Sequence, residues 1–481
     1  MKVPSNATGL SLLGDRAEAD RIIEQAVRSC QTTRGNGSYD PRDAERVYFR
    51  MTRRPGHPRS IGRALTQIAR RFCKEAEISC AACPIRQFCE TGRSNSNEHP
   101  AVPFIDLFCG AGGFSLGFEA LGFTPALSID HDPSAVRTYN FNRLTSGGHG
   151  ILADIEDVAY DTSLRGLAPL IIGGPPCQPF SMANRQRAAS DQRDRLIDVF
   201  LHATMTSQAK VFVIENVAGV RQREEVIKSF GERVGYVIFQ REINASDVGV
   251  PQNRNRTFIF GVKAKTCAQH SEVEATFLRL LSEQRLLLKT ALRDAIRDLP
   301  ALRAPYQSNA TVADSETVGF AVAPFHGGTL SQYTEMLNGG KNPQFLFNHR
   351  AKYLNGRDRE IYRLLRPGEK SDADSIAHIM PYKHRAHLFR DKFYRLKWTD
   401  VSKTITAHMY YDCHMYIHPT QARGLTPREA ARIQGFPDSY FFVGRPNEWY
   451  RQIGNAVSPI VAGEVARIAH GLLALFGETD R

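Results

Sequence analysis

Long apolar runs are absent from the 481-residue sequence, and no run approaches the roughly 20 residues that a membrane-spanning helix needs. The first residues, MKVPSN, lack the apolar core of a secretory signal peptide. Internal repeats and low-complexity tracts are missing as well, which excludes a repeat array. Together these absences predict a cytosolic protein without a membrane partner.

Acidic residues are missing from residues 46–71, a stretch that holds eight arginines. This run is either a solvated helix face or a surface that contacts phosphates. The whole chain has a formal net charge of +12, which favours a polyanionic partner. Its length suggests about three domains, and 42% hydrophobic residues allow a sizeable core.

Disulfides are not expected for nine cysteines in a reducing compartment. Four of them, Cys73, Cys80, Cys83 and Cys89, form a C-x6-C-x2-C-x5-C pattern that indicates a metal site. Tetrahedral sulfur ligation suits zinc or an iron–sulfur cluster. The spacing resembles the [4Fe–4S] loop of the endonuclease III and MutY glycosylases, which also carry a basic helix before the loop. We therefore expect a [4Fe–4S] cluster, with zinc as the alternative. The resemblance stops at the loop, so base excision is not implied.

The sequence GGPPCQPFS, residues 173–181, follows a short apolar run that is typical of a buried strand. Two glycines and two prolines end that strand and fix a loop. Cys177 is therefore expected at the carboxyl end of a strand, where open α/β sheets place their ligands. A lone cysteine is commonly structural, yet packing does not require a loop with prolines on both sides. The other interpretation is a catalytic nucleophile.

A second strand, residues 104–108, runs into the glycine-rich residues 110–113 and then into a helix. Glycines at such a turn let the backbone approach a ligand, as in dinucleotide-type sites. Asp130 ends the next strand, and Asp154 follows a third. The sequence thus predicts a nucleotide-like cofactor at the carboxyl edge of a parallel sheet.

Charged residues mark two further strands. Glu215 ends the apolar residues 211–214 and is either a functional acid or a helix N-cap. Arg254 and Arg256 share one face of a predicted strand. They either reach one pocket together or lie on a solvated face.

In this order the motifs resemble those of the C5-cytosine DNA methyltransferases, over residues 103–470, where residues 452–457 (QIGNAV) complete the set. The resemblance implies an α/β fold with a Rossmann-like S-adenosylmethionine-dependent methyltransferase domain at 103–264. A smaller irregular target-recognition region would span 265–395, and C-terminal motifs at 396–481 would close back on the catalytic domain. Residues 1–99 lie outside it and would form a small helical iron–sulfur module.

The resemblance also implies roles for individual residues. Cys177 would add to C6 of cytosine, Glu215 would place a proton at N3, and Arg256 would hold O2 with support from Arg254. The cofactor-binding residues would be Phe104, Asp106, Phe108, Gly110, Gly112, Gly113, Phe114, Asp130, His131, Asp154, Ile155, Pro175, Asn455, Ala456 and Val457.

The expected function is methylation of a flipped cytosine in a specific sequence of double-stranded DNA. Such an enzyme would act as a monomer in the bacterial cytoplasm, associated with the nucleoid, either beside a cognate restriction endonuclease or as an orphan modification enzyme. Two alternatives remain: a tRNA cytosine-5 methyltransferase and a redox-sensing DNA-binding protein.

Overall fold

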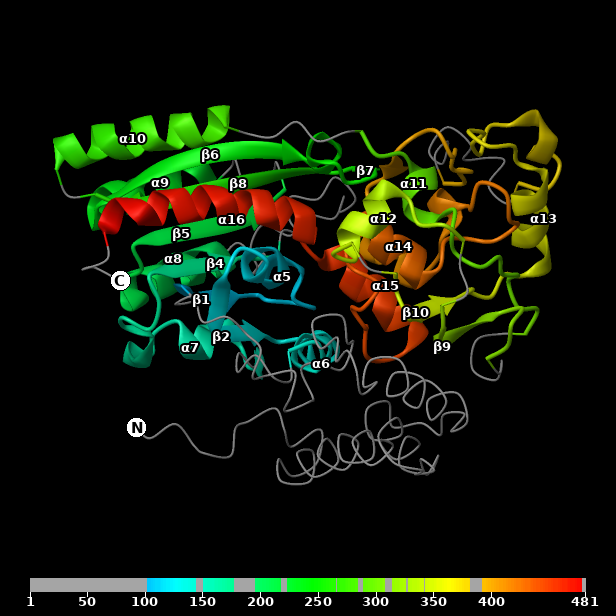
Figure 1. Cartoon of the computed structure of the whole chain (residues 1–481), viewed down its shortest axis with the longest axis horizontal. Helices are drawn as coiled ribbons and strands as arrows, with labels where there is room; N and C mark the ends of the chain where they lie inside the picture. The colour runs from blue at the N-terminus through cyan, green and yellow to red at the C-terminus, as the bar shows by residue number, and fades with distance from the viewer. Residues whose placement is uncertain are drawn as a thin grey trace, which may run out of the picture.

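The computed structural model describes residues 102–143, 150–176, 195–217, 223–264, 266–283, 289–307, 314–325, 328–340, 342–380 and 392–477. In these residues the chain forms two lobes that lie side by side, one built on a large sheet and one mostly of short helices and loops (Figure 1). Cys177 and the four cysteines of the predicted metal site, Cys73, Cys80, Cys83 and Cys89, lie outside the described residues.

The first lobe contains a seven-stranded sheet in the order β3-β2-β1-β4-β5-β8-β6. Neighbouring strands are parallel from β3 to β5, whereas β8 runs antiparallel to both β5 and β6. The strands are β1 (Val102–Leu107), β2 (Phe123–Asp130), β3 (Gly150–Leu152), β4 (Leu170–Gly173), β5 (Val211–Asn216), β6 (Tyr236–Asn244) and β8 (Asn255–Lys263). The parallel strands β1, β2 and β4 therefore end at one edge, as the sequence predicted.

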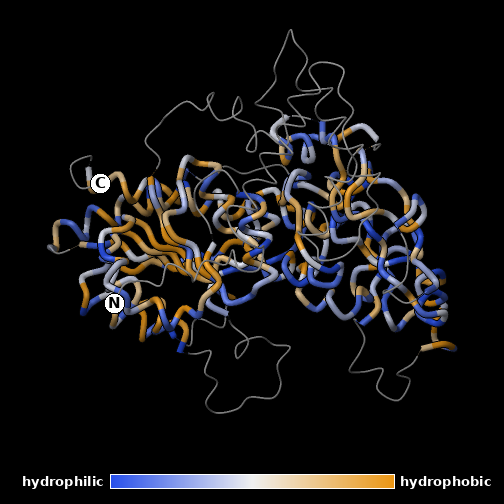
Figure 2. Tube along the Cα trace, turned by 90° about the horizontal axis from the view of Figure 1, so that it is seen from below, coloured by the Kyte–Doolittle hydropathy of each residue, from blue (hydrophilic) through white to orange (hydrophobic). Residues whose placement is uncertain are grey.

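Side chains alternate between the two faces of the sheet, and both faces are covered by helices. Phe104, Ile172 and Val213 pack on one face with α5 (Gly113–Glu119), α10 (Cys267–Ser282) and α16 (Pro459–Leu473). Ile105, Ile171 and Ile214 pack on the other with α7 (Ile155–Val158), α8 (Arg195–Ser207) and α9 (Glu224–Val234). Figure 2 shows these apolar strands gathered in the sheet lobe. Burial on both faces explains why the strands are continuous apolar runs.

The second lobe is organised around the antiparallel pair β9 (Gly319–Pro324) and β10 (Phe345–Arg350). Its helices are α11 (Leu292–Ile296), α12 (Gln332–Leu337), α13 (Gly356–Leu364), α14 (Pro427–Gln434) and α15 (Pro446–Asn455). The helix α6 (Pro133–Phe141) and the 3-10 helices η4 (Thr162–Leu164), η7 (Ala245–Val248), η8 (Asp374–Ile376), η10 (Ala407–Tyr410), η11 (His414–Tyr416) and η12 (Ala474–Phe476) complete the helical elements of the described chain. A two-strand contact, β7 (Gln252–Asn253) with β11 (Ser402–Lys403), joins the lobes.

The core of the second lobe crosses the predicted boundary between residues 395 and 396. Leu292 and Leu346 share one hydrophobic cluster with Leu396, Ile433 and Trp449. The C-terminal motifs up to α15 therefore fold with the preceding region, and within the described chain it is α16 that returns to the sheet. The sequence motifs of residues 396–481 do not by themselves indicate which core their apolar residues join.

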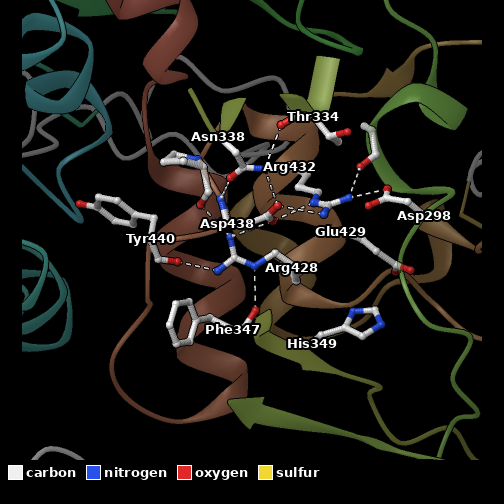
Figure 3. Close-up of polar contacts among 12 residues, drawn as sticks. Asp298, Thr334, Asn338, Phe347, His349, Arg428, Glu429, Arg432, Asp438 and Tyr440 are labelled. Carbon is white, nitrogen blue, oxygen red and sulfur yellow. Dashed lines mark hydrogen bonds and ion pairs between the residues drawn. The ribbon is translucent and has the colours of Figure 1, made fainter. Parts of the chain in front are cut away.

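Buried arginines hold the second lobe together (Figure 3). Arg432 on α14 forms a two-pronged contact with Asp438, at 2.8 and 2.9 Å, and also reaches Asp298 at 2.6 Å. Arg428, one turn earlier, donates to the carbonyl oxygens of Phe347, Pro437 and Tyr440. The network ties α14 to β10, to the loop after α14 that holds Pro437 and Tyr440, and to Asp298 after α11.

One described segment, Pro446–Phe476, is long and apolar enough to cross a membrane by length and composition, with a mean hydropathy of 1.4. It joins α15 to α16, and α16 buries Val461, Val465 and Leu472 in the sheet core. The core helix of a globular protein meets the same criterion, so this segment does not indicate a membrane protein.

Candidate active site and cofactor loop

The glycine loop after β1 follows an unusual backbone path. Phe108, Gly110 and Gly112 all have positive φ, at 64°, 54° and 88°. A Cβ placed on Gly110 would meet no atom within 4 Å, so there is open space on that side of the loop. A Cβ on Gly113 would lie 2.3 Å from the carbonyl oxygen of Val457, which brings the predicted C-terminal cofactor segment against the loop.

Asp130 at the end of β2 fixes the position of this loop. One carboxylate oxygen accepts a hydrogen bond from the Gly110 amide at 2.8 Å, and the other accepts from the Asp132 amide at 2.8 Å. Burial raises the pKa of Asp130 above its usual value, while these two amides oppose the rise. His131, predicted beside it, is exposed, and its Nδ1 lies 3.6 Å from the Asp130 carboxylate. Each Asp130 oxygen keeps a lone pair for a hydroxyl donor.

Asp106 lies beneath the same loop and is fully buried. The Ser115 hydroxyl donates to its Oδ2, whereas Oδ1 has no hydrogen-bond partner in the described part of the chain. Burial raises the pKa of Asp106 to about 7. A buried acceptor without a donor costs free energy, so this oxygen fits a ligand that brings an N–H group, such as the amino group of S-adenosylmethionine.

Two residues that the sequence did not single out hold the loop from behind. Arg143 donates to the carbonyl oxygen of Gly112 at 3.0 Å and pairs with Glu119 at 2.7 Å. Tyr440, from the second lobe, donates to the carbonyl oxygen of Ala111 at 2.5 Å. No local pattern marks these residues, because their partners lie about 30 and 330 residues away in the chain.

The remaining predicted cofactor residues divide into two groups. Asp154 is the N-cap of α7 and accepts from the Glu156 amide at 3.0 Å, next to the buried Ile155. Asn455 is exposed at the end of α15, and Ala456 follows it as a nearly buried residue. Asp154 and Asn455 are therefore accessible from solvent, whereas Ile155 and Ala456 are buried.

Phe104 and Phe114 lie in the hydrophobic core instead. Phe104 is fully buried and packs against Phe118, with ring centroids 5.7 Å apart. Phe114 is 4% exposed and packs against Phe118 and Phe258. Because β1 alternates, Phe104 points under α5 and packs in the hydrophobic core there.

Glu215 and Arg256 form an ion pair where β5 and β8 meet. The Nε of Arg256 lies 2.8 Å from Oε1 of Glu215, and the two side chains are only 18% and 12% exposed. The other carboxylate oxygen of Glu215 faces Gly174, where a Cβ would lie 3.2 Å away. The Asn216 side chain donates to the carbonyl oxygen of Pro175 at 3.4 Å. The segment that leads into Cys177 is therefore held beside the acid–arginine pair.

Arg254 takes a different direction from Arg256. It lies in the break between β7 and β8, and its guanidinium donates to the carbonyl oxygens of Ile405, Gly454 and Ala456 at 2.7, 3.4 and 3.1 Å. Burial lowers its pKa to about 9, and nearby Arg256 adds to that shift. Sequence alternation predicted that both arginines share one face, whereas the strand break turns Arg254 toward the C-terminal segment.

The chain matches the family model described as C-5 cytosine-specific DNA methylase over residues 102–469. The Type II methyltransferase M.AgeI of Thalassovita gelatinovora is 31% identical over 420 residues, covering 75% of this chain and 97% of the relative. M1.HphI of Haemophilus parahaemolyticus is also 31% identical, with 76% and 86% covered.

A solved structure of a DNA modification methyltransferase encoded within an E. coli prophage has the same fold. It superposes with a TM-score of 0.58 at 24% identity, covering 78% of this chain and 99% of that one. The match of the family model across both lobes, together with the two curated relatives, confirms the resemblance: the chain belongs to the C-5 cytosine-specific DNA methylases.

Proposed function

We propose that the protein transfers a methyl group from S-adenosylmethionine to C5 of a flipped cytosine in a specific DNA sequence, through a covalent bond between Cys177 and C6. The observation that carries the proposal is the Glu215–Arg256 pair beside the segment that ends one residue before Cys177. A passive DNA-binding protein has no use for an acid and a cation held at 2.8 Å beside the segment that leads into a cysteine.

Cytosine C5 is too weak a nucleophile to take a methyl group directly. When the Cys177 thiolate adds to C6, electron density moves through the ring toward N3, where Glu215 supplies a proton. Arg256 donates to the ring oxygen O2 and stabilises the developing negative charge. The resulting enamine is nucleophilic at C5, and S-adenosylmethionine supplies an electrophilic methyl group there when bound. A base then removes the C5 proton, Cys177 leaves from C6 as the thiolate, and the proton at N3 returns to Glu215.

Cofactor binding in this proposal rests on the loop after β1. Gly110 leaves open space for the ligand, Asp130 offers acceptors for hydroxyl groups, and Asp106 offers one unpaired oxygen. The segment from Asn455 to Val457 closes the site from the second lobe, because Val457 contacts Gly113. The described residues of both lobes therefore fit the cofactor that the family uses.

The matched relatives M.AgeI and M1.HphI are named Type II methyltransferases. By analogy, this chain would be a modification enzyme of the bacterial cytoplasm, with a cognate restriction endonuclease as its partner. It would act on the nucleoid as a monomer. Double-stranded DNA fits the formal net charge of +12.

The N-terminal cysteines add a second element to the proposal. Cys73, Cys80, Cys83 and Cys89 would hold a structural [4Fe–4S] cluster that supports the arginine-rich residues 46–71 against DNA phosphates. The support is the cysteine spacing and the lack of acids in that run. Among the described residues there is no group of three or more His, Cys, Asp or Glu side chains that could hold a metal ion.

Bisulfite sequencing of DNA from cells that express the protein tests the proposed reaction and reports the target sequence. The matched control is Cys177→Ser, which should bind DNA yet leave every cytosine unmodified. A duplex with 5-fluorocytosine at the target should trap the wild-type protein covalently, since fluorine cannot leave as the C5 proton does. Methylation by the serine variant at the wild-type rate would refute the nucleophile.

A further inference from the structure

Three rings gather at η10 and the residue after it, and we call His408, Tyr410 and Tyr411 the aromatic tip; His408 and Tyr411 are exposed, and Tyr410 is half-buried. Tyr411 is 72% exposed, and the His408 side chain is 60% exposed. The Tyr411 ring centroid lies 5.0 Å from that of Tyr410 and 5.6 Å from that of His408. Exposed rings in contact with one another leave apolar faces open to solvent, on which another planar group can stack.

The backbone beneath the aromatic tip is held firmly. Lys352 donates to the carbonyl oxygens of Met409, Tyr410 and Tyr411 at 3.0, 2.7 and 2.9 Å. Burial lowers the pKa of Lys352, so its ammonium group is largely withdrawn from water. The Met409 side chain is fully buried in the core of the second lobe. These contacts fix the direction of the rings, as a preformed binding surface requires.

On one side, the aromatic tip is connected to the segment that carries Arg254 and Arg256. β11 pairs in parallel with β7, so residues 404–411 leave this contact in the same direction as Arg254 and Arg256. Arg254 donates to the carbonyl oxygen of Ile405, three residues before the tip. A Cβ on Gly454 would lie 2.2 Å from the Ala407 amide, so the end of α15 lies directly against the start of η10.

On the other side, the aromatic tip reaches the cofactor loop. The guanidinium of Arg451 lies 5.9 Å from the centre of the Tyr410 ring. The same guanidinium pairs with Asp132 at 3.0 Å, and the Asp132 amide donates to Asp130. Tyr410 is thus linked through Arg451 and Asp132 to Asp130, the predicted ribose-binding carboxylate, while Ile405 at the start of the same segment is held by Arg254.

We propose that the aromatic tip binds the DNA duplex beside the flipped cytosine, with Tyr411 stacking on a nucleobase that loses its neighbour when the cytosine leaves the helix. The inference rests on the proposed function and adds a DNA contact outside residues 265–395, the predicted target-recognition region. A nucleobase suits the tip because aromatic rings stack on any base without reading its edges. The tip therefore stabilises the flipped state and contributes little to the choice of sequence.

The test uses Tyr411→Ala in the full-length protein, since an exposed side chain is not needed for folding. The matched control is Tyr160→Ala, which removes another exposed tyrosine, 58% accessible, from the sheet lobe. The rescue variant is Tyr411→Phe, which keeps the ring. Dissociation constants are measured by fluorescence anisotropy with S-adenosylhomocysteine and a duplex that carries the target sequence. A second duplex with 2-aminopurine at the target position reports flipping by its fluorescence.

Tyr411→Ala should weaken DNA binding at least about fivefold and reduce the 2-aminopurine signal, in line with the loss of one base–aromatic stack. Tyr411→Phe and Tyr160→Ala should behave like the wild type, and calorimetry should show unchanged cofactor affinity for all three. Wild-type binding and flipping by Tyr411→Ala, in a protein that methylates cytosine, would overturn this inference alone. A wild-type protein that methylates no cytosine would instead refute the proposed function, and this inference with it.

Discussion

Replacing Arg432 by methionine should destabilise the second lobe strongly, because buried Asp298 loses its ion-pair partner and buried Asp438 keeps only the more distant Arg428, at 3.9 Å (Figure 3). The side chains of Arg432 and Asp438 are fully buried, and that of Asp298 is 6% exposed. Removing one partner of a buried pair typically costs about 3–5 kcal/mol. Asp438 keeps the Asn338 amide at 2.8 Å, so Arg432→Met should lower the free energy of unfolding by about 3–5 kcal/mol rather than by more.

Urea unfolding followed by circular dichroism measures this loss, and two further variants separate its causes. The exposed pair Arg363–Glu360 is the matched control, and Arg363→Met should leave the urea midpoint unchanged. The double variant Arg432→Met with Asp438→Asn should recover part of the loss, because it removes one of the stranded charges.

The stability loss of Arg432→Met should depend on pH. In the wild type, Arg432 holds the pKa of Asp438 below its usual value, against the effect of burial. Without Arg432, burial would raise that pKa, so the folded variant would take up a proton as the pH falls. The deficit of Arg432→Met should therefore shrink between pH 8 and pH 5. A wild-type midpoint for this variant, or a deficit independent of pH, would refute the reasoning.

Three other outcomes are expected. Asp130→Ala should weaken S-adenosylmethionine binding by about 2 kcal/mol in calorimetry without a change in secondary structure, and unchanged affinity would exclude Asp130 from the cofactor site. Burial lowers the pKa of His349 to about 4 and that of His418 to about 3. The unfolded chain binds these protons near pH 6.5, so stability should fall by about 2 kcal/mol per histidine from pH 7 to pH 5, and His349→Gln with His418→Gln should flatten that slope. Anaerobically purified protein should be brown and contain about four irons per chain, whereas one zinc per colourless chain would disprove the cluster.

The central strands were predictable because burial on both sides leaves a simple signal. Residues 104–108, 170–172 and 211–214 are largely apolar runs, and β1, β4 and β5 lie there, each between two neighbouring strands in the sheet. The edge strand β6, Tyr236–Asn244, is half-exposed over most of its length and gives no such run. The order of the strands could not be predicted either, because no local sequence pattern indicates that β8 lies between β5 and β6.

Individual site residues could be predicted where a sequence motif follows the end of a strand. The residues that hold the cofactor loop in place could not. Asp130 and Glu215 lie where apolar strands stop, and each meets a partner in the structure. Arg143 and Tyr440 carry no motif, because they act on main-chain carbonyl groups that every residue offers. For Arg254 the motif was found, but the direction of the side chain was not predicted. It lies in a one-residue break between two strands and contacts the carbonyl oxygen of Ile405.

One short junction explains why motifs spread over some 350 residues act as one site. Residues 454–457 join α15 of the second lobe to α16 on the sheet. Arg254 holds the carbonyl oxygens of Gly454 and Ala456, while Gly113 packs against Val457 and Ala407 packs against Gly454. The cofactor loop, the arginine strand and the start of the aromatic tip therefore meet on the same four residues. A shift of this junction would move all three together, so binding of the cofactor and of DNA should be coupled through it.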